Sequence, residues 1–197
     1  MTDRNRFVER SSILFLTNGI KDTSMVDIAL ECNTSKEIIY KNFKDKEYLI
    51  NQIIQFQIEE MESKLKNCSV NSLNAIVELN YFFNYLKEFL LTISPDFYGD
   101  LKFSYPDIFK RLIIFKDTVI IPFLQKNILR GKKEKIYKYD LNSKEISQSY
   151  NLVYQILISD NFFLLLEKNK QAIDFLNTLF LHRLVTIKGL KLISSLD

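Results

Sequence analysis

The sequence predicts an all-α protein of about nine helices, and three observations lead to that fold class. Along most of the chain, apolar residues recur every three or four positions, which is the spacing of one helix face. Only four glycines and three prolines occur among 197 residues, too few for the many turns of an all-β fold. Hydrophobic residues make up 47% of the chain, with 16 Phe and 10 Tyr, which is ample material for a packed core.

The first helix is expected over residues 3–18. Phe7, Leu14 and Phe15 fall on one face of it, and we expect them to pack beneath the helices that follow. Gly19 is well placed to end the helix, because glycine readily adopts the left-handed conformation found at helix C-termini.

The next short helix is expected from residue 25 to residue 32. Ser24 can cap it by accepting a backbone N–H, and Asp27 stands three residues later, which is the spacing of a capping box. Asn33 and Thr34 then interrupt the helix, and asparagine tolerates a left-handed turn better than most residues.

A second short helix follows that turn, with Ser35 as its cap. We expect Ile38, Ile39 and Phe43 to point inward from it. Two capped helices joined by about three residues have the layout of a helix-turn-helix, whose second helix enters the major groove of DNA.

The stretch from Gly19 to Leu49 resembles the DNA-binding domain of TetR-family transcriptional regulators. The resemblance implies an N-terminal three-helix, helix-turn-helix DNA-binding domain followed by a larger C-terminal helical ligand-binding and dimerisation domain. Four positions depart from the family pattern, namely Asn33, Glu37, Ile38 and Asn42. The matching residues are Phe15-x3-Gly19, Thr23-Ser24-Met25, Ile28-Ala29, Ser35-Lys36, Ile39-Tyr40, Phe43 and Lys46-Glu47-x-Leu49.

The resemblance also implies which residues contact a double-stranded DNA operator. Tyr40, Lys46, Thr23 and Ser24 resemble the family's phosphate contacts. Pure helix capping is the alternative for the two hydroxyls, and a half-buried packing residue is the alternative for Tyr40. The full set of candidate DNA-binding residues is Thr23, Ser24, Ser35, Lys36, Tyr40, Lys41, Asn42 and Lys46.

Within that set, three side chains are placed to reach base edges or nearby phosphates. Lysine reads guanine and asparagine reads adenine in ordinary direct readout, and the three are Lys36, Lys41 and Asn42. Arg4 and Arg6 open the first helix. Contact with the DNA backbone or minor groove and a solvated helix end are equally open for both.

The remainder of the chain is expected to be helical, and we divide the domains as 1–66 and 67–197 at a polar, turn-like gap. Asp45 caps the helix that precedes this gap, and Gly131 marks a later loop of residues 131–135. Pro122 should kink its helix because it lacks a backbone N–H. The expected helices are 45–66, 73–93, a short segment around 97–105, 106–130, 142–169 and 171–194.

The last two helices are apolar over more than half of their circumference. A helix at the surface of a monomer needs only one apolar stripe, so the excess predicts a second buried face against a partner subunit. In the resembled family, the two C-terminal helices form a dimeric four-helix bundle, which implies a homodimer here. Burial inside a single larger bundle is the alternative.

Aromatic residues are frequent in the second half of the chain, and they could line a cavity for a small, largely apolar effector. The alternative is that these stripes belong to the core, as aromatic residues at helical spacing more often do. The candidate ligand-binding residues are Phe82, Phe89, Tyr98, Phe103 and Phe109.

Charge and composition limit the function classes. Residues 1–50 carry eight Lys/Arg and eight Asp/Glu, so only the local surplus of lysines from Lys36 to Lys46 favours DNA binding. This neutrality leaves open a helical ligand-binding or protein-interaction module that no longer reads DNA. His182 is the only histidine, and Cys32 and Cys68 lie far apart. We therefore expect no metal, no cofactor, no enzyme activity, no membrane span and a cytoplasmic location.

Overall fold

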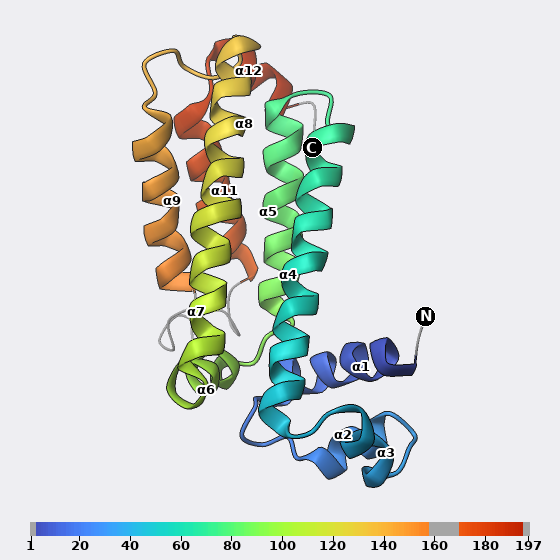
Figure 1. The fold of residues 1–197 in the computed structure, drawn as a ribbon. Helices are drawn as coiled ribbons and strands as arrows, with labels where there is room; N and C mark the ends of the chain where they lie inside the picture. The colour runs from blue at the N-terminus through green and yellow to red at the C-terminus, as the bar shows by residue number, and fades with distance from the viewer. Residues whose placement is uncertain (1–2, 158–169, 195–197) are drawn as a thin grey trace. The chain divides into compact units, whose positions relative to one another are not determined.

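The chain folds as the all-α protein that the sequence predicts (Figure 1). The computed structural model describes residues 3–157 and 170–194. Within this described part the chain forms helices and no strand, apart from one isolated bridge between Tyr137 and Val185. The α-helices are α1 (Asp3–Asn18), α2 (Met25–Glu31), α3 (Lys36–Asn42), α4 (Lys46–Asn71), α5 (Ala75–Leu91), α6 (Pro95–Ser104), α7 (Pro106–Phe115), α8 (Ile121–Lys133), α9 (Ser143–Leu157), α11 (Lys170–Leu184) and α12 (Ile187–Ile193).

The helices form two compact units. The first unit comprises Met1–Met61 together with Thr92–Ile114, and the second comprises Glu62–Leu91 together with Phe115–Asp197. Our division at residue 66 concerns functional domains and stays a prediction. Among the described residues, no helix is both long enough and apolar enough to cross a membrane.

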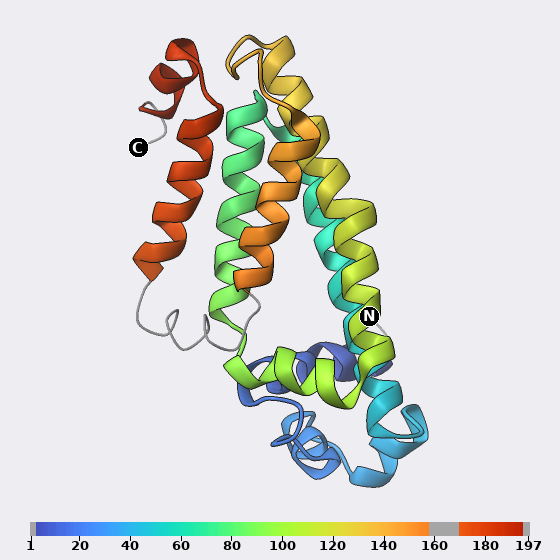
Figure 2. The same cartoon turned by 90° about the vertical axis from the view of Figure 1, so that its left-hand side faces the viewer.

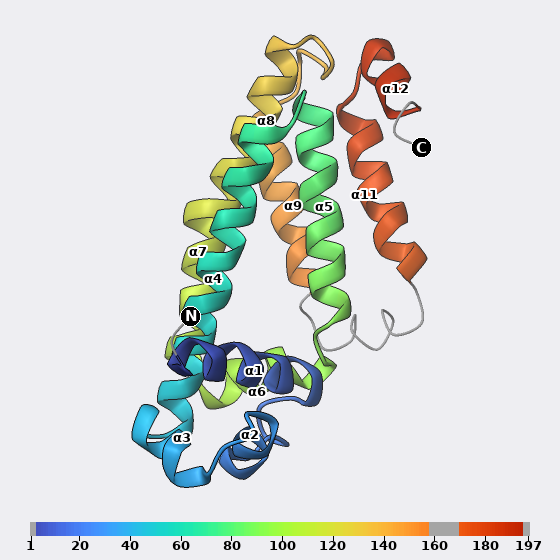
Figure 3. The same cartoon turned by 90° about the vertical axis from the view of Figure 1, so that its right-hand side faces the viewer.

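The first unit is built on a core shared by α1, α2, α3 and α4. Phe15, Ile28, Ile39 and Phe43 are at most 1% exposed, so the inward faces predicted for these helices are confirmed except at Ile38, which is described below. Helix α6 lies against α1 (Figure 3). The Ser94 N–H donates to the Leu16 carbonyl at 2.6 Å, which fixes the start of α6 to the end of α1.

A salt bridge connects α6 to the loop that follows α1. Asp100 is buried on α6, and its carboxylate accepts the backbone N–H of Lys21 at 2.8 Å and pairs with the Lys21 ammonium at 3.1 Å. The turn after α1 follows the predicted pattern, because Gly19 has a φ of 86°. The loop before α2 is therefore held by backbone geometry and by a buried carboxylate.

The second unit is a helical bundle in which α5, α8, α9 and α11 run with roughly parallel axes (Figure 2). Its core contains a cluster of aromatic rings contributed by α5, α8, α9 and α11. Ring centroids within the cluster lie 5.2–5.9 Å apart, which is the range of favourable aromatic pairing. The members of the cluster are Phe82, Phe83, Phe123, Tyr150 and Phe180.

A buried polar network ties α5 to α8 in the second unit. The Glu78 carboxylate is only 6% exposed and accepts from Arg130 at 3.4 Å and from the Asn127 amide at 2.8 Å. The Tyr137 hydroxyl donates to the Ala75 carbonyl at 3.1 Å, and it lies 3.2 Å from Asn127 Oδ1. Each polar group of this network that is buried therefore has a partner, as a dry interior requires.

Three predicted helix limits were wrong. Helix α4 does not end near Lys66 but continues to Asn71, because the polar stretch after Lys66 contains neither Gly nor Pro to stop it. Gly131 lies inside α8 rather than in a loop. The helix predicted from 106 to 130 is interrupted by a π-helical segment at Lys116–Ile120, directly before Pro122.

The last predicted helix is divided into α11 and α12 at Val185 and Thr186. The Thr186 side chain caps α12 by accepting from Gly189 N, and the Thr186 N–H donates to Ile136 O at 2.9 Å. A contact distant in sequence thus overrides a continuous helical pattern. Asn142 caps α9 by accepting the backbone N–H groups of Lys144 and Glu145. The expected continuation of that helix to Asn169 lies outside the described residues.

Candidate nucleic-acid interface

The helix-turn-helix is assembled by two side-chain caps and one left-handed residue. Ser24 Oγ accepts from Asp27 N at 3.2 Å, and Asp27 Oδ2 accepts from the Ser24 N–H at 2.7 Å, so the predicted capping box is confirmed. Asn33 has a φ of 50°. Ser35 Oγ accepts from Ile38 N at 3.4 Å at the start of α3. Local sequence chemistry therefore sets the angle between α2 and α3.

These two serines also stabilise nearby carboxylates. A hydrogen bond from the Ser24 hydroxyl, assisted by the Ser24 backbone N–H, holds the pKa of Asp27 below its ordinary value. A hydrogen bond from the Ser35 hydroxyl likewise lowers the pKa of Glu37. Both carboxylates lie in the first turn of a helix, where a negative charge interacts favourably with the helix dipole.

Helix α3 buries one narrow edge and exposes the rest. Ile39 and Phe43, one turn apart, are 0% exposed. Ile38 is 45% exposed, so the prediction that it points inward was wrong. Successive side chains of a helix point about 100° apart around its axis. When Ile39 and Phe43 face the core, Ile38 therefore points to the side of the helix.

The outward surface of α3 carries Lys36, Tyr40 and Lys41. Tyr40 is 43% exposed, and the Lys36 ammonium lies 5.6 Å from the centre of its ring, which is a cation–π distance. Lys41 is also exposed. The structure therefore brings two cations and one phenol together on one solvent-facing surface, which we call the α3 face.

Thr23 and Asn42, two other candidates, form hydrogen bonds within the first unit. Thr23 is 1% exposed, and its hydroxyl donates to the Gly19 carbonyl at 2.8 Å. The Asn42 amide donates to the Ile38 carbonyl at 2.8 Å. Ser24 rather than Thr23 caps α2, and a phosphate contact by Thr23 stays a prediction.

Lys46 is half-buried rather than free in solvent. Its ammonium donates to the Ile20 carbonyl at 2.5 Å and lies 5.7 Å from the centre of the Phe15 ring. Burial lowers the pKa of Lys46, while nearby Asp100, Asp27 and Asp22 oppose that shift. The side chain thus connects the start of α4 to the loop before α2.

Arg4 has a role that the sequence did not indicate. Its guanidinium donates to the Tyr48 hydroxyl at 2.7 Å and lies 5.6 Å from the centre of the Phe43 ring. Arg10 similarly donates to the Glu31 carbonyl at 2.8 Å. These contacts attach α1 to the end of each short helix, and they join residues too distant in sequence for any local pattern to reveal.

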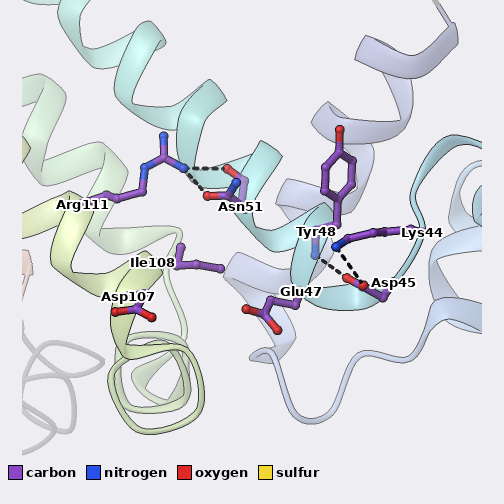
Figure 4. Close-up of a pocket in the computed structure, with 8 residues that line it drawn as sticks. All are labelled: Lys44, Asp45, Glu47, Tyr48, Asn51, Asp107, Ile108 and Arg111. Carbon is purple, nitrogen blue, oxygen red and sulfur yellow. Dashed lines mark hydrogen bonds and ion pairs between the residues drawn. The ribbon is translucent and has the colours of Figure 1, made fainter.

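A cleft of about 340 Å³ lies in the first unit between the start of α4 and α7 (Figure 4). On one side, Arg111 donates to Asn51 and Gln55 of α4. Glu47 of α4 and Asp107 of α7 also line the cleft. Arginine bound to neutral amides fastens α7 to α4 without cancelling the acidic groups.

The candidate ligand-binding aromatics are divided among several elements. Phe82 belongs to the aromatic core cluster, and Phe89 stacks on Tyr85 with ring centroids 6.5 Å apart. Tyr98 is buried and makes an edge contact with Phe97, whereas Phe103 is 73% exposed. Phe109 is half-buried on α7. The position of Phe82 favours the core alternative, and an effector site formed by the other residues stays a prediction.

The N-terminal sequence matches a known family. Residues 8–53 match the family described as "Bacterial regulatory proteins, tetR family". This range contains α2 and α3 entirely, most of α1 and the first part of α4. It therefore covers the complete helix-turn-helix.

One curated relative is similar over 64 residues of the chain. It is described as "Uncharacterized HTH-type transcriptional regulator YerO" from Bacillus subtilis (strain 168), and it is 34% identical over 64 residues. The match covers 32% of this chain. It spans 22%, or about a fifth, of the length of that protein.

Solved structures extend the likeness to the whole fold. A TetR-family regulator from Agrobacterium tumefaciens has a TM-score of 0.75 at 11% identity, covering 93% of this chain and 98% of the other. One from Marinobacter aquaeolei VT8 has a TM-score of 0.73 at 17% identity, covering 100% and 97%. Residues 8–53 of this chain therefore form a helix-turn-helix segment of the TetR family of bacterial regulatory proteins, and the chain as a whole has the fold of the solved TetR-family regulators.

Proposed function

We propose that the protein is a homodimeric repressor that binds a double-stranded DNA operator and is released from it by a small effector. The observation that carries this proposal is the α3 face, where Lys36, Tyr40 and Lys41 are exposed while Ile39 anchors the helix from below. Exposed cations on the second helix of a helix-turn-helix are suited to phosphates and guanine edges.

Within this proposal the candidate residues have different roles. Lys36, Tyr40 and Lys41 meet DNA directly, and the exposed Ser24 and Ser35 add phosphate contacts at the starts of α2 and α3. Lys46, Thr23 and Asn42 act as positioning residues through their bonds to Ile20, Gly19 and Ile38.

Alanine variants of the α3 face are expected to weaken DNA binding. The measurement is a fluorescence titration against DNA that the protein selects from a random pool, repeated at several salt concentrations. Lys41→Ala should lose about tenfold in affinity if the ammonium contacts a guanine, and should relax the base preference at that position. The logarithm of the binding constant falls with the logarithm of the salt concentration, and Lys36→Ala should make this fall shallower by about one if Lys36 contacts a phosphate.

Lys110→Ala is the matched control, because Lys110 is an exposed lysine of the same unit on α7. It should bind the selected DNA as the unmodified protein does. Wild-type affinity in both Lys36→Ala and Lys41→Ala would contradict the assigned face.

Dimerisation is proposed through the last two long helices. Phe175 and Leu179 lie one turn apart on α11 and are 62% and 51% exposed, while Ile173 and Leu184 of the same helix are buried. An apolar strip opposite an already buried stripe is suited to a second copy of the chain. In a dimer, the two α3 helices would enter successive major grooves, about 34–36 Å apart.

The neutral charge of residues 1–50 favours a second candidate function, a helical ligand-binding or protein-interaction module that does not read DNA. The DNA selection separates the two functions. Failure to enrich any DNA at low salt, where electrostatic binding is strongest, would favour the module.

A further inference from the structure

The second unit contains a groove between the end of α4 and the π-helical start of α8. Its volume is about 510 Å³, which falls within the usual range of small-molecule sites. On α4, the lining residues recur at the spacing of one helix face, from Glu62 to Val70. Glu62 and Val70 are eight positions apart, which corresponds to about 12 Å along the helix axis.

The floor of the groove is apolar. Leu65 and Phe123 are 5% and 8% exposed, and they form its base. Val119 and Pro122 line the wall contributed by the π-helical segment and α8. A π-helical interruption of a long helix occurs frequently at functional sites, and here it brings Thr118 and Val119 to the groove.

Charges are distributed unevenly along the groove. Lys66 and Lys126 line it and are exposed, and in the described parts of the chain no salt bridge engages either ammonium. Glu62 stands one turn before Lys66, at the other end. Helices α4 and α8 run in the same direction (Figures 1 and 3), so Lys126 lies toward the end marked by Val70, away from Glu62.

We infer that this groove binds a small anionic amphiphile, with its carboxylate between Lys66 and Lys126 and its short acyl chain over Leu65 and Phe123. The two cations match one negative head group, and the apolar floor matches a tail. Glu62 disfavours the reversed orientation, because it would face the carboxylate across a short distance. Binding at this groove stands independently, whereas its role as the effector site rests on the proposed function.

The test is isothermal titration calorimetry of the full chain with decanoate, kept below the concentration at which it forms micelles. Saturable one-to-one binding is expected. Lys66→Ala and Lys126→Ala should each weaken it about tenfold, the effect of losing one charge-assisted hydrogen bond. Butyrate, which has the same head group and a shorter tail, should bind much more weakly, because less apolar surface is buried.

Lys133→Ala is the control, since Lys133 is an exposed lysine of α8 that does not line the groove; its affinity for decanoate should equal that of the unmodified chain. Absence of saturable binding, or an affinity for decanoate in both the Lys66→Ala and Lys126→Ala variants that equals that of the unmodified chain, would overturn the inference.

The same ligand is then added to the complex with selected DNA. Release of DNA that depends on Lys126 supports the effector role. Binding of decanoate without release would remove that role and leave the groove as a binding site. Selection of DNA together with no decanoate binding would overturn the groove alone and leave the proposed function standing.

Discussion

Replacing Arg130 by methionine is expected to lower the free energy of unfolding by about 3 kcal/mol. The variant would leave the Glu78 carboxylate, which is 6% exposed, without its cationic partner at 3.4 Å. It would also remove the guanidinium bond to the Ser72 carbonyl at 2.7 Å. The expected loss lies at the low end for a broken buried pair, because the Arg130 side chain is itself 30% exposed. Urea denaturation followed by circular dichroism measures it.

The double variant Glu78→Leu/Arg130→Met separates two causes of the lost stability, the unpaired Glu78 carboxylate and the missing contacts of Arg130. Replacing both members of a buried ion pair by apolar residues is often nearly neutral, so the double variant should recover most of the lost stability. A double variant as unstable as Arg130→Met would show that an isolated carboxylate is not the cause.

Gly131→Ala is expected to destabilise the protein by roughly 3 kcal/mol, at the upper end for an overpacked core. A Cβ atom at this position would lie 2.1 Å from Cδ2 of Tyr137. Tyr137 is 2% exposed, so its ring has no solvent to move into. Helix propensity alone predicts the opposite sign, since alanine in a helix interior is favoured over glycine by about 1 kcal/mol. A thermal melt therefore decides between crowding and propensity.

The exposed neighbour Lys133 gives the comparison for that melt, and Lys133→Ala should change stability by less than about 0.5 kcal/mol. Combining Gly131→Ala with Tyr137→Ala should cost less than the sum of the single changes, because the second removes the ring that the first displaces. A Gly131→Ala protein more stable than the parent would contradict the crowding argument.

The sequence was sufficient where structure is set by near neighbours. The Ser24 and Ser35 caps, the left-handed Gly19 and Asn33, and the Asp45 cap of α4 are all found in the structure. Each depends on a residue type and a spacing of a few positions, and such signals are visible in a single chain.

The sequence failed where distant contacts decide. The apolar pattern continues through Leu184, and only the Thr186 cap lies near the end of α11. The break is fixed by two backbone hydrogen bonds, from Lys138 N–H to Leu184 O and from Thr186 N–H to Ile136 O. In the candidate site, helical periodicity located the exposed Lys36 and Lys41. It could not show that the Lys46 ammonium turns toward Ile20, or that Arg4 reaches Tyr48. Long side chains select such partners only after the helices have packed.

The buried hydroxyl of Tyr137 makes the second unit sensitive to alkali. Burial raises the pKa of Tyr137 above its ordinary value of 10.0, so the folded protein holds a neutral phenol that the unfolded chain would ionise. The stabilisation is complete below that ordinary value and is lost as the solution becomes more basic. Strong base should therefore weaken the contact between α5 and α8, because it removes the proton of a hydroxyl that is buried between them.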